Sequence, residues 1–237
     1  MDTFCILHIG TNDVNSKSIH KTSPERFINL LDPFLKESSW TTINCLEDDL
    51  PKEVNNYDAY LITGGKYSVF EDLDWQYNLF NFIQNIYSTN IPLIGICYGH
   101  QAIAHALGGH VERFDNGWGA GVTSVNVIDQ PALLLPMVEK IYLLAMHQDQ
   151  VTTIPTEATR FLDSHFCHNS GFYIDDRVLA IQQHPEFTPE LCRDLIVRRK
   201  ERIGKQYKPA LQSLDIQHQG EYVGQWIANF INLRSSD

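Results

Sequence analysis

Residues 91–107 read IPLIGICYGHQAIAHAL, an apolar run that leads through a glycine-flanked cysteine into a good helix-forming stretch. The apolar run, Ile91 to Ile96, is typical of a strand buried on both faces of a parallel sheet, and Pro92 is tolerated near its start. Gln101 to Leu107 predicts a helix. Cys97 is therefore expected at the carboxyl end of a central strand, where the chain turns into that helix.

The chain before this stretch alternates short apolar runs with longer amphipathic ones, which indicates strands and crossover helices in a mainly parallel sheet. We expect Ser23 to cap the first helix with Pro24 at its first position, and Pro33 to kink it. The predicted elements, in chain order, are Phe4 to Ile9 (strand), Ser23 to about Lys36 (helix), Trp40 to Leu46 and Ala59 to Thr63 (strands), and about Asp74 to Tyr87 (helix).

After residue 108 the pattern changes. Gly109 to about Ile174 consists of short β-prone pieces separated by Gly, Pro and Asn, which predicts an antiparallel insertion, and Gly204 to Gly220 is predicted to be irregular. The expected fold class is α/β, a flavodoxin-like three-layer sandwich with a central mostly parallel sheet and this small antiparallel insertion, in one domain over residues 1–237. The predicted elements of this half are strands at Val122 to Ile128, Ile141 to Ala145 and Val178 to Gln183, and helices at about Pro189 to Ile203 and Tyr222 to Leu233.

The composition, 43% hydrophobic and 20% charged, is typical of a soluble globular protein. A net charge of −11 argues against nucleic-acid binding, which needs a basic face, and a small soluble substrate fits better. Five cysteines without a CxxC pair indicate a reducing cytoplasm, with neither a disulfide framework nor a zinc knuckle. The amino-terminal MDTFCILHIG is no signal peptide, and no run is long enough to span a membrane, so neither export nor anchoring is expected.

Cys97 lies between two glycines in residues 95–99, GICYG, which have the GxCxG form of a nucleophile elbow. Such an elbow turns a strand abruptly into a helix and places its central side chain at the helix amino terminus, where the dipole favours a thiolate. The alternative is a buried strand cysteine without chemistry. The pattern alone is weak, and the elbow needs a base to be functional.

His184 and Glu186 lie at the end of a predicted strand, where alternation aims both side chains to one side. Glu186 can then orient the imidazole while its other nitrogen faces the thiol; the alternative is a surface turn. Gly64 and Gly65 end another strand at the same sheet edge. The backbone amides of Gly65 and Tyr98 are therefore candidates to stabilise an oxyanion, the alternative being an ordinary loop.

The motifs GICYGHQ, TGG and IQQHPEF resemble those of the class I glutamine amidotransferases, the triad-type glutaminase domains. The segments GGHVERFDNGWGAG, HQDQV and GFYIDDRVLAIQQHPEF are similar to those of stand-alone members related to the glutaminase domain of GMP synthase and to γ-glutamyl peptidases. The likeness covers nearly the whole chain. It departs from the commonest pattern at Gln183 and Lys66, which bear on the rim of the pocket and hence on the identity of the substrate.

The resemblance implies that Cys97 is acylated, that His184 is the general base and acid, and that Glu186 orients the histidine. It also implies that the amides of Gly65 and Tyr98 form the oxyanion hole, and that no metal or organic cofactor is required. The residues implied to line a γ-glutamyl pocket, partly through backbone groups, are Gln101, Met146, His147, Gln148 and Asp149.

The leading hypothesis is glutaminase-type hydrolysis of a γ-glutamyl amide bond through a thioester, with glutamine or a γ-glutamyl amide as the small-molecule substrate. The chain has no Walker loop or ATP pyrophosphatase motif, so an ATP-dependent synthetase that uses the ammonia would be a separate subunit. Within the enzyme class, the alternative is a stand-alone γ-glutamyl peptidase or amide hydrolase. Outside it, the alternative is a catalytically silent binding protein of the same fold.

Three other features are set apart from this site. HFCH, residues 165–168, has no second cluster at zinc spacing and is interpreted as a half-exposed strand. Trp118 is either core or pocket wall. The basic residues that end the helix beginning near Pro189 are predicted to be a solvated face, namely Arg198, Arg199, Lys200 and Arg202.

Overall fold

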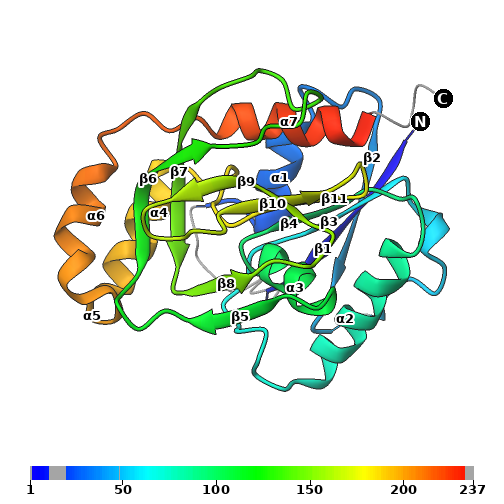
Figure 1. Cartoon of the computed structure of the whole chain (residues 1–237), viewed down its shortest axis with the longest axis horizontal. Helices are drawn as coiled ribbons and strands as arrows, with labels where there is room; N and C mark the ends of the chain where they lie inside the picture. The colour runs from blue at the N-terminus through cyan, green and yellow to red at the C-terminus, as the bar shows by residue number, and fades with distance from the viewer. Residues whose placement is uncertain (1, 11–19, 48, 233–237) are drawn as a thin grey trace.

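The computed structural model describes residues 2–10, 20–47 and 49–232. Within these residues a nine-stranded sheet runs through the molecule in the order β2-β1-β3-β4-β11-β10-β9-β6-β7 (Figure 1). Its parallel strands are β2 (Ser39–Asn44), β1 (Thr3–His8), β3 (Ala59–Ile62), β4 (Leu93–Ile96) and β11 (Val178–Ile181). Its antiparallel strands are β10 (Gly171–Ile174), β9 (Thr159–Ser164), β6 (Gly119–Val127) and β7 (Lys140–His147). The predicted α/β fold class is confirmed.

The predicted antiparallel segment continues the central sheet beyond β11. Four of its strands belong to that sheet, while β5 (His110–Arg113) and β8 (Asp149–Thr153) pair in a separate two-stranded sheet. The backbone amide of His184 donates to the carbonyl of Leu144 in β7, 2.8 Å away. This hydrogen bond attaches the segment that follows β11 to the antiparallel half of the sheet.

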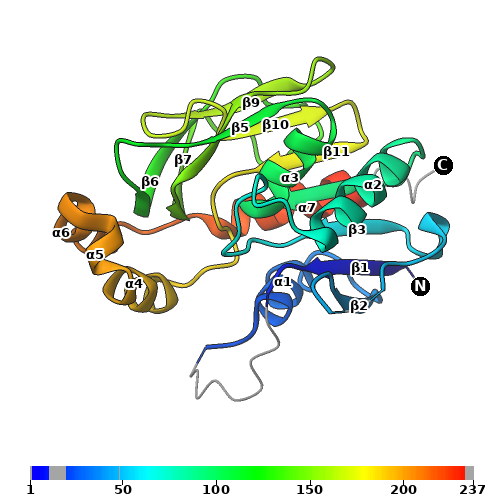
Figure 2. The ribbon, with the colours of Figure 1, turned by 90° about the horizontal axis from the view of Figure 1, so that it is seen from below.

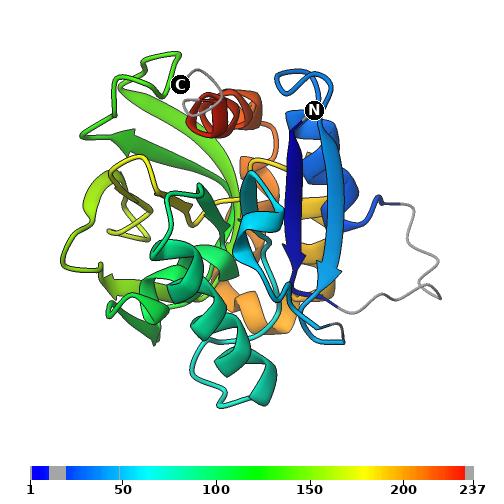
Figure 3. The same ribbon diagram turned by 90° about the vertical axis from the view of Figure 1, so that its right-hand side faces the viewer.

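Helices cover both faces of the parallel half. α1 (Ser23–Leu31) and α7 (Gly220–Asn232) lie on one face, and α2 (Asp74–Tyr87) and α3 (Tyr98–Ala106) on the other (Figure 3). Successive side chains of β1 point to opposite faces of the sheet. Phe4 and Ile6 pack with α1 and α7, whereas Cys5 and Leu7 pack with α2 and α3. Burial on both faces explains why this strand is apolar without alternation.

The strands β3, β4 and β11 end at the same edge of the sheet. Ile62 of β3 pairs with Gly95 of β4, and Ile96 of β4 pairs with Ile181 of β11. Segments that follow these strands therefore meet in space, as expected for parallel neighbours. They carry the residues singled out as functional candidates.

The remaining helices pack against β6 and β7 at one end of the molecule (Figure 2). The single helix predicted from Pro189 to Ile203 is interrupted at Arg199, and the stretch predicted to be irregular contains a helix. The prediction that residues 204–220 are irregular was wrong. Their buried apolar residues, Ala210 and Leu214, are too few for a helical period to be recognised in the sequence. These elements are α4 (Pro189–Arg198), α5 (Lys200–Ile203), η2 (Gly204–Gln206) and α6 (Tyr207–Ser213), and a further short 3-10 helix, η1, spans Val54–Asn56.

None of the helices in the described ranges is long and apolar enough to cross a membrane. Helix α2 has the bounds predicted for it, and α7 ends at Asn232. Leu233, the predicted end of that last helix, lies outside the described residues.

The predicted N-cap and the predicted carboxyl end of α1 were wrong. Thr22, not Ser23, is the N-cap, with its hydroxyl accepting from the Glu25 amide and the Glu25 carboxylate accepting from the Thr22 amide at 2.7 Å. The helix stops at Leu31 rather than continuing with a kink, because Pro33 has no amide hydrogen to extend the ladder. The reciprocal capping box with Glu25 is what distinguishes the two neighbouring hydroxyl residues.

We therefore expect Thr22→Ala to lower the free energy of unfolding by about 1 kcal/mol, since a capping hydroxyl is lost. The matched control is Ser23→Ala, which removes a hydroxyl one residue along and should cost less than half as much. Urea denaturation of the two variants measures the difference. An equal or larger loss for Ser23→Ala would contradict the observed cap.

Candidate active site

Cys97 occupies a strained turn between β4 and α3. Its backbone has φ 54° and ψ −100°, a left-handed conformation that is uncommon for a residue with a side chain. A Cβ atom on Gly95 would lie 2.6 Å from the carbonyl oxygen of Gly99, and one on Gly99 would overlap the carbonyl of Ile62 in β3. Both glycines are therefore required for the elbow to fit between strand and helix.

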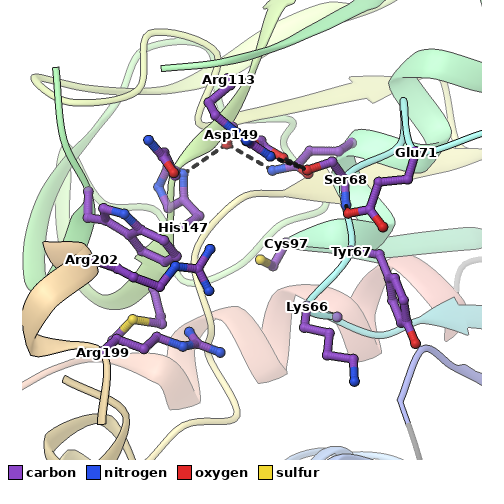
Figure 4. A pocket seen from close by; sticks show the side chains of 15 residues that line it. Lys66, Tyr67, Ser68, Glu71, Cys97, Arg113, His147, Asp149, Arg199 and Arg202 are labelled. Atoms are coloured by element: carbon purple, nitrogen blue, oxygen red, sulfur yellow. Dashed lines mark hydrogen bonds and ion pairs between the residues drawn. The ribbon is translucent and has the colours of Figure 1, made fainter. Parts of the chain in front are cut away.

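The elbow places Cys97 at the amino terminus of α3 and at the floor of a pocket (Figure 4). Its side chain is 5% exposed. Tyr98 begins the helix, so its amide has no acceptor in a preceding turn. The Tyr98 ring points into the core, where Gln76 donates to its hydroxyl at 2.9 Å.

His184 lies between Cys97 and Glu186. Its Nδ1 is 2.8 Å from Oε1 of Glu186, and its side chain is also hydrogen-bonded to that of Cys97. Both His184 and Glu186 are only 5% exposed. The ring of Phe187 stacks on the imidazole with centroids 3.9 Å apart, which together with the Leu144 contact fixes the plane of the histidine. The three side chains form one continuous buried chain of contacts.

The charge state of His184 follows from these neighbours. Burial alone lowers the pKa of its imidazole, but the negative charges of Cys97 and Glu186 and the hydrogen bonds to both raise the pKa to about 10. The site therefore favours the charged imidazolium form of His184. This is the charge state that a cysteine nucleophile with a histidine partner uses.

The Gly64-Gly65 turn after β3 leaves room for this arrangement. A Cβ atom on Gly64 would lie 2.6 Å from Cε1 of His184 and 3.4 Å from Cβ of Cys97. A Cβ atom on Gly65 would lie 2.5 Å from Cγ2 of Ile9. Gly65 lines the same pocket as Cys97.

The residues that the resemblance implies for a γ-glutamyl pocket all line the pocket that contains Cys97, namely Gln101, Met146, His147, Gln148 and Asp149. Nε2 of Gln101 donates to the Asp149 carbonyl at 2.9 Å, and Nδ1 of His147 lies 3.1 Å from the same oxygen. Burial lowers the pKa of His147 to about 4, so its ring is neutral at pH 7. Nε2 of Gln148 donates to the carbonyl of Phe114 at 3.2 Å.

The carboxylate of Asp149 joins two residues that sequence analysis did not identify. Its Oδ1 is 3.4 Å from Nε of Arg113, and its Oδ2 accepts a short hydrogen bond from the hydroxyl of Ser68 (Figure 4). The backbone amide of Ser68 donates to Oε1 of Glu71 at 2.7 Å. No local signal marks Ser68, Glu71 or Arg113, because they meet only when β5 and β8 pair beside the turn after β3.

The prediction of a solvated basic face after α4 was wrong in part. Arg199 is half-buried and Arg202 is exposed, and both line the Cys97 pocket, with their guanidinium carbons 5.7 and 4.9 Å from the centre of the Trp118 ring. Trp118, which sequence analysis left open, belongs to a buried hydrophobic cluster and also lines the pocket. Arg198 and Lys200 are exposed, as predicted. Arg199 lies at the interruption between α4 and α5, and Arg202 lies in α5.

Arg26 of α1 is a further residue that sequence analysis missed. It lies 5.4 Å from the centre of the Phe187 ring and lines the same space as Glu186. Burial lowers the pKa of Arg26, whereas the negative charge of Glu186 raises it. Oε2 of Glu186 and Nε of Arg26 are both buried, and neither atom has a hydrogen-bond partner among the residues that the structure describes. A cation from the first helix thus faces the far side of the His184–Glu186 pair.

HFCH is a turn after β9 rather than a half-exposed strand, with Cys167 buried and both histidines exposed. Its Phe166 packs edge-on against the ring of His147. Among the residues that the structure describes, no group of three or more His, Cys, Asp or Glu side chains is placed to hold a metal ion.

Comparison with known proteins agrees with this geometry. The family model "Glutamine amidotransferase class-I" matches residues 29–201. Gamma-glutamyl peptidase 3 of Arabidopsis thaliana is 27% identical over 81% of this chain and 80% of its own length. One subunit of the glutamine-hydrolyzing GMP synthase of Sulfolobus acidocaldarius is 30% identical over 59% of this chain and 72% of its own length.

A solved glutamine amidotransferase structure from Methylobacillus flagellatus superposes with a TM-score of 0.75, at 21% identity, over 97% of this chain and 95% of that one. At this level of identity the likeness concerns the fold.

Gly64→Ala tests the space between Cys97 and His184. The added methyl group should push the imidazole away from the thiol, and a thiol without an imidazolium partner is only a few per cent thiolate at pH 7. Alkylation of Cys97 by iodoacetamide at pH 7 should therefore slow more than about tenfold. Ser23→Ala, a change at the edge of the same space, should react like the wild type; equal rates in all three proteins would contradict the contact.

Glu186→Gln tests the electrostatics. Because a carboxylate favours the charged imidazolium, its removal should lower the pKa of His184 from about 10 by at least about 1 unit. An NMR titration of the His184 ring measures the midpoint. The matched control is Glu190→Gln, which neutralises an exposed carboxylate on α4 and should leave the midpoint in place. An unshifted midpoint in the Glu186 variant would show that its carboxylate does not act on the ring.

Proposed function

Because this chain belongs to the class I glutamine amidotransferase family, we propose that it hydrolyses a γ-glutamyl amide bond with Cys97, His184 and Glu186 as its catalytic triad. The observation that carries the proposal is the buried chain of contacts from the elbow cysteine through the imidazole to the carboxylate. A binding protein without activity would not need a strained cysteine, a charged histidine and a buried carboxylate in line. The silent alternative is therefore disfavoured.

In the first step the thiolate of Cys97 attacks the γ-carbonyl carbon of the substrate. A carbon–sulfur bond forms and the carbonyl oxygen becomes an oxyanion, for which the amides of Gly65 and Tyr98 are the proposed donors. The carbon–nitrogen bond then breaks as the imidazolium of His184 gives its proton to the departing nitrogen. Ammonia or an amine leaves, and a glutamyl thioester remains on Cys97.

In the second step water attacks the thioester. His184, now neutral, accepts a proton from the water, and the new tetrahedral intermediate collapses with cleavage of the carbon–sulfur bond. Glutamate is released, and the thiolate and imidazolium are restored. Glu186 keeps the imidazole oriented through both steps, and it stabilises the charged ring without taking its proton.

The γ-glutamyl part of the substrate is proposed to bind beside Gln101 and the segment from Met146 to Asp149. These residues line the pocket, and Gln101 and His147 are both hydrogen-bonded to the carbonyl of Asp149 before any ligand arrives. Such prior ordering reduces the entropy lost on binding. Arg113 and Asp149 present charges of both signs there, which suits a glutamyl head with an ammonium and a carboxylate.

Two physiological settings fit this chemistry. One relative is named a γ-glutamyl peptidase, which corresponds to a chain that works alone. Another is named as one of the subunits of GMP synthase, and by analogy a second candidate is a glutaminase that delivers ammonia to a separate ATP-dependent synthetase. The two differ in the group that departs from Cys97.

The proposed function predicts that Cys97→Ala stops glutamate release from glutamine and from γ-glutamyl amides, a loss of more than about 1000-fold. Glutamate is measured with a coupled dehydrogenase assay. The matched control is Cys45→Ala, which removes a thiol that lies in a separate pocket and should stay active. Equal glutamate release by wild type and Cys97→Ala would refute the proposed nucleophile.

Covalent labelling separates an enzyme from a binding protein. A diazo-ketone analogue of glutamine should alkylate Cys97 in the wild type and leave the Cys97→Ala protein unmodified. Binding of the analogue without alkylation would favour the silent alternative.

A further inference from the structure

Resting on the proposed function, we infer that Arg199 and Arg202 bind a negatively charged group on the departing part of the substrate. The preferred substrates are then γ-glutamyl amino acids, whose leaving amine carries a carboxylate, rather than glutamine.

The position of Arg199 is the first argument. A second pocket adjoins the one above Cys97 and contains His184 in its wall. Arg199, Gly65 and Met146 line both pockets. Because His184 must reach the departing nitrogen to protonate it, the leaving group has to extend toward this shared border. Arg199 stands where the substituents of that nitrogen would lie.

The second argument is charge. The chain carries a net charge of −11, yet its Cys97 pocket is lined by four basic residues and two acidic ones, namely Lys66, Arg113, Arg199 and Arg202 against Glu71 and Asp149. Arg113 is paired with Asp149 at 3.4 Å. Neither Arg199 nor Arg202 belongs to any ion pair formed within the described ranges of the chain. Their charges are thus available to a ligand.

The third argument is that the two arginines are held in place without an anion. Both guanidinium groups lie against the ring of Trp118, and in Figure 4 they flank the pocket on the side opposite Lys66. Burial and the neighbouring Arg202 both lower the pKa of Arg199. Two like charges kept close together repel, and a bound carboxylate relieves that repulsion while it accepts charge-assisted hydrogen bonds.

The size of the leaving group decides between the substrate classes. Ammonia, which departs from glutamine, has no substituent that can touch either arginine. An amino acid carries its carboxylate one carbon away from the departing nitrogen, so it projects from His184 toward Arg199. Only the second class of substrate uses the basic border of the pocket. The opposite end, with Arg113 and Asp149, remains for the glutamyl head.

The test compares three substrates with the same glutamyl group: γ-glutamylglycine, its neutral amide γ-glutamylglycinamide, and glutamine. For the wild type, kcat/KM should be highest for γ-glutamylglycine. In Arg199→Gln and Arg202→Gln, the ratio of kcat/KM for γ-glutamylglycine to that for γ-glutamylglycinamide should fall about 10- to 100-fold, as loss of a hydrogen bond to a charged group predicts. Arg199→Lys, which keeps the charge, should recover part of the ratio.

The matched control is Arg198→Gln, which removes an exposed charge next to Arg199 and outside the pocket and should leave the ratio unchanged. An equal fall for all three substrates in the Arg199 and Arg202 variants would overturn the inference, since the arginines would then serve the glutamyl head or the fold. A wild type that prefers glutamine or the neutral amide would overturn it as well. In both cases Cys97-dependent glutamate release leaves the proposed function standing, whereas no glutamate from any substrate refutes both.

Discussion

The parallel hydrogen-bonded register of β3, β4 and β11 is the constraint on which the rest of the site depends. Ile62 pairs with Gly95, and Ile96 with Ile181, so the three strands end side by side. The chain then delivers the glycine turn, Cys97 and His184 to one place, although they are far apart in sequence. Gly99 lies so close to the Ile62 carbonyl that α3 can pack on β3 only without a side chain there. Sheet register and elbow thus determine each other.

The antiparallel half of the sheet contributes part of the pocket wall. β7 fixes the backbone of His184 through the Leu144 carbonyl, and its end supplies Met146 and His147. The helices that pack on β6 and β7 carry Arg199 and Arg202 to the opposite wall. Both halves of one sheet thus contribute residues to the pocket of Cys97.

The charges around His184 differ from the charges at the rim of the pocket. Around His184, anionic groups on both sides of a buried ring raise its pKa and keep it charged. At the rim, two arginines share one indole ring and lack an anionic partner among the described residues. The acidic surface of the chain and its basic pocket rim are compatible because net charge describes the whole surface, whereas recognition depends on groups within a few ångströms.

The sequence by itself determined the α/β class, the bounds of α2, and the elbow and histidine motifs, because each signal lies within a few neighbouring residues. The period of α2, the glycines around Cys97 and the two-residue spacing of His184 and Glu186 are local patterns. Only the tertiary structure decided that Thr22 caps α1, that Ala210 helps to bury a helix, and that Arg199 and Arg202 face the pocket. A basic helix end has the same sequence whether it faces water or Trp118. Which of these it faces depends on packing between segments that are distant in the chain.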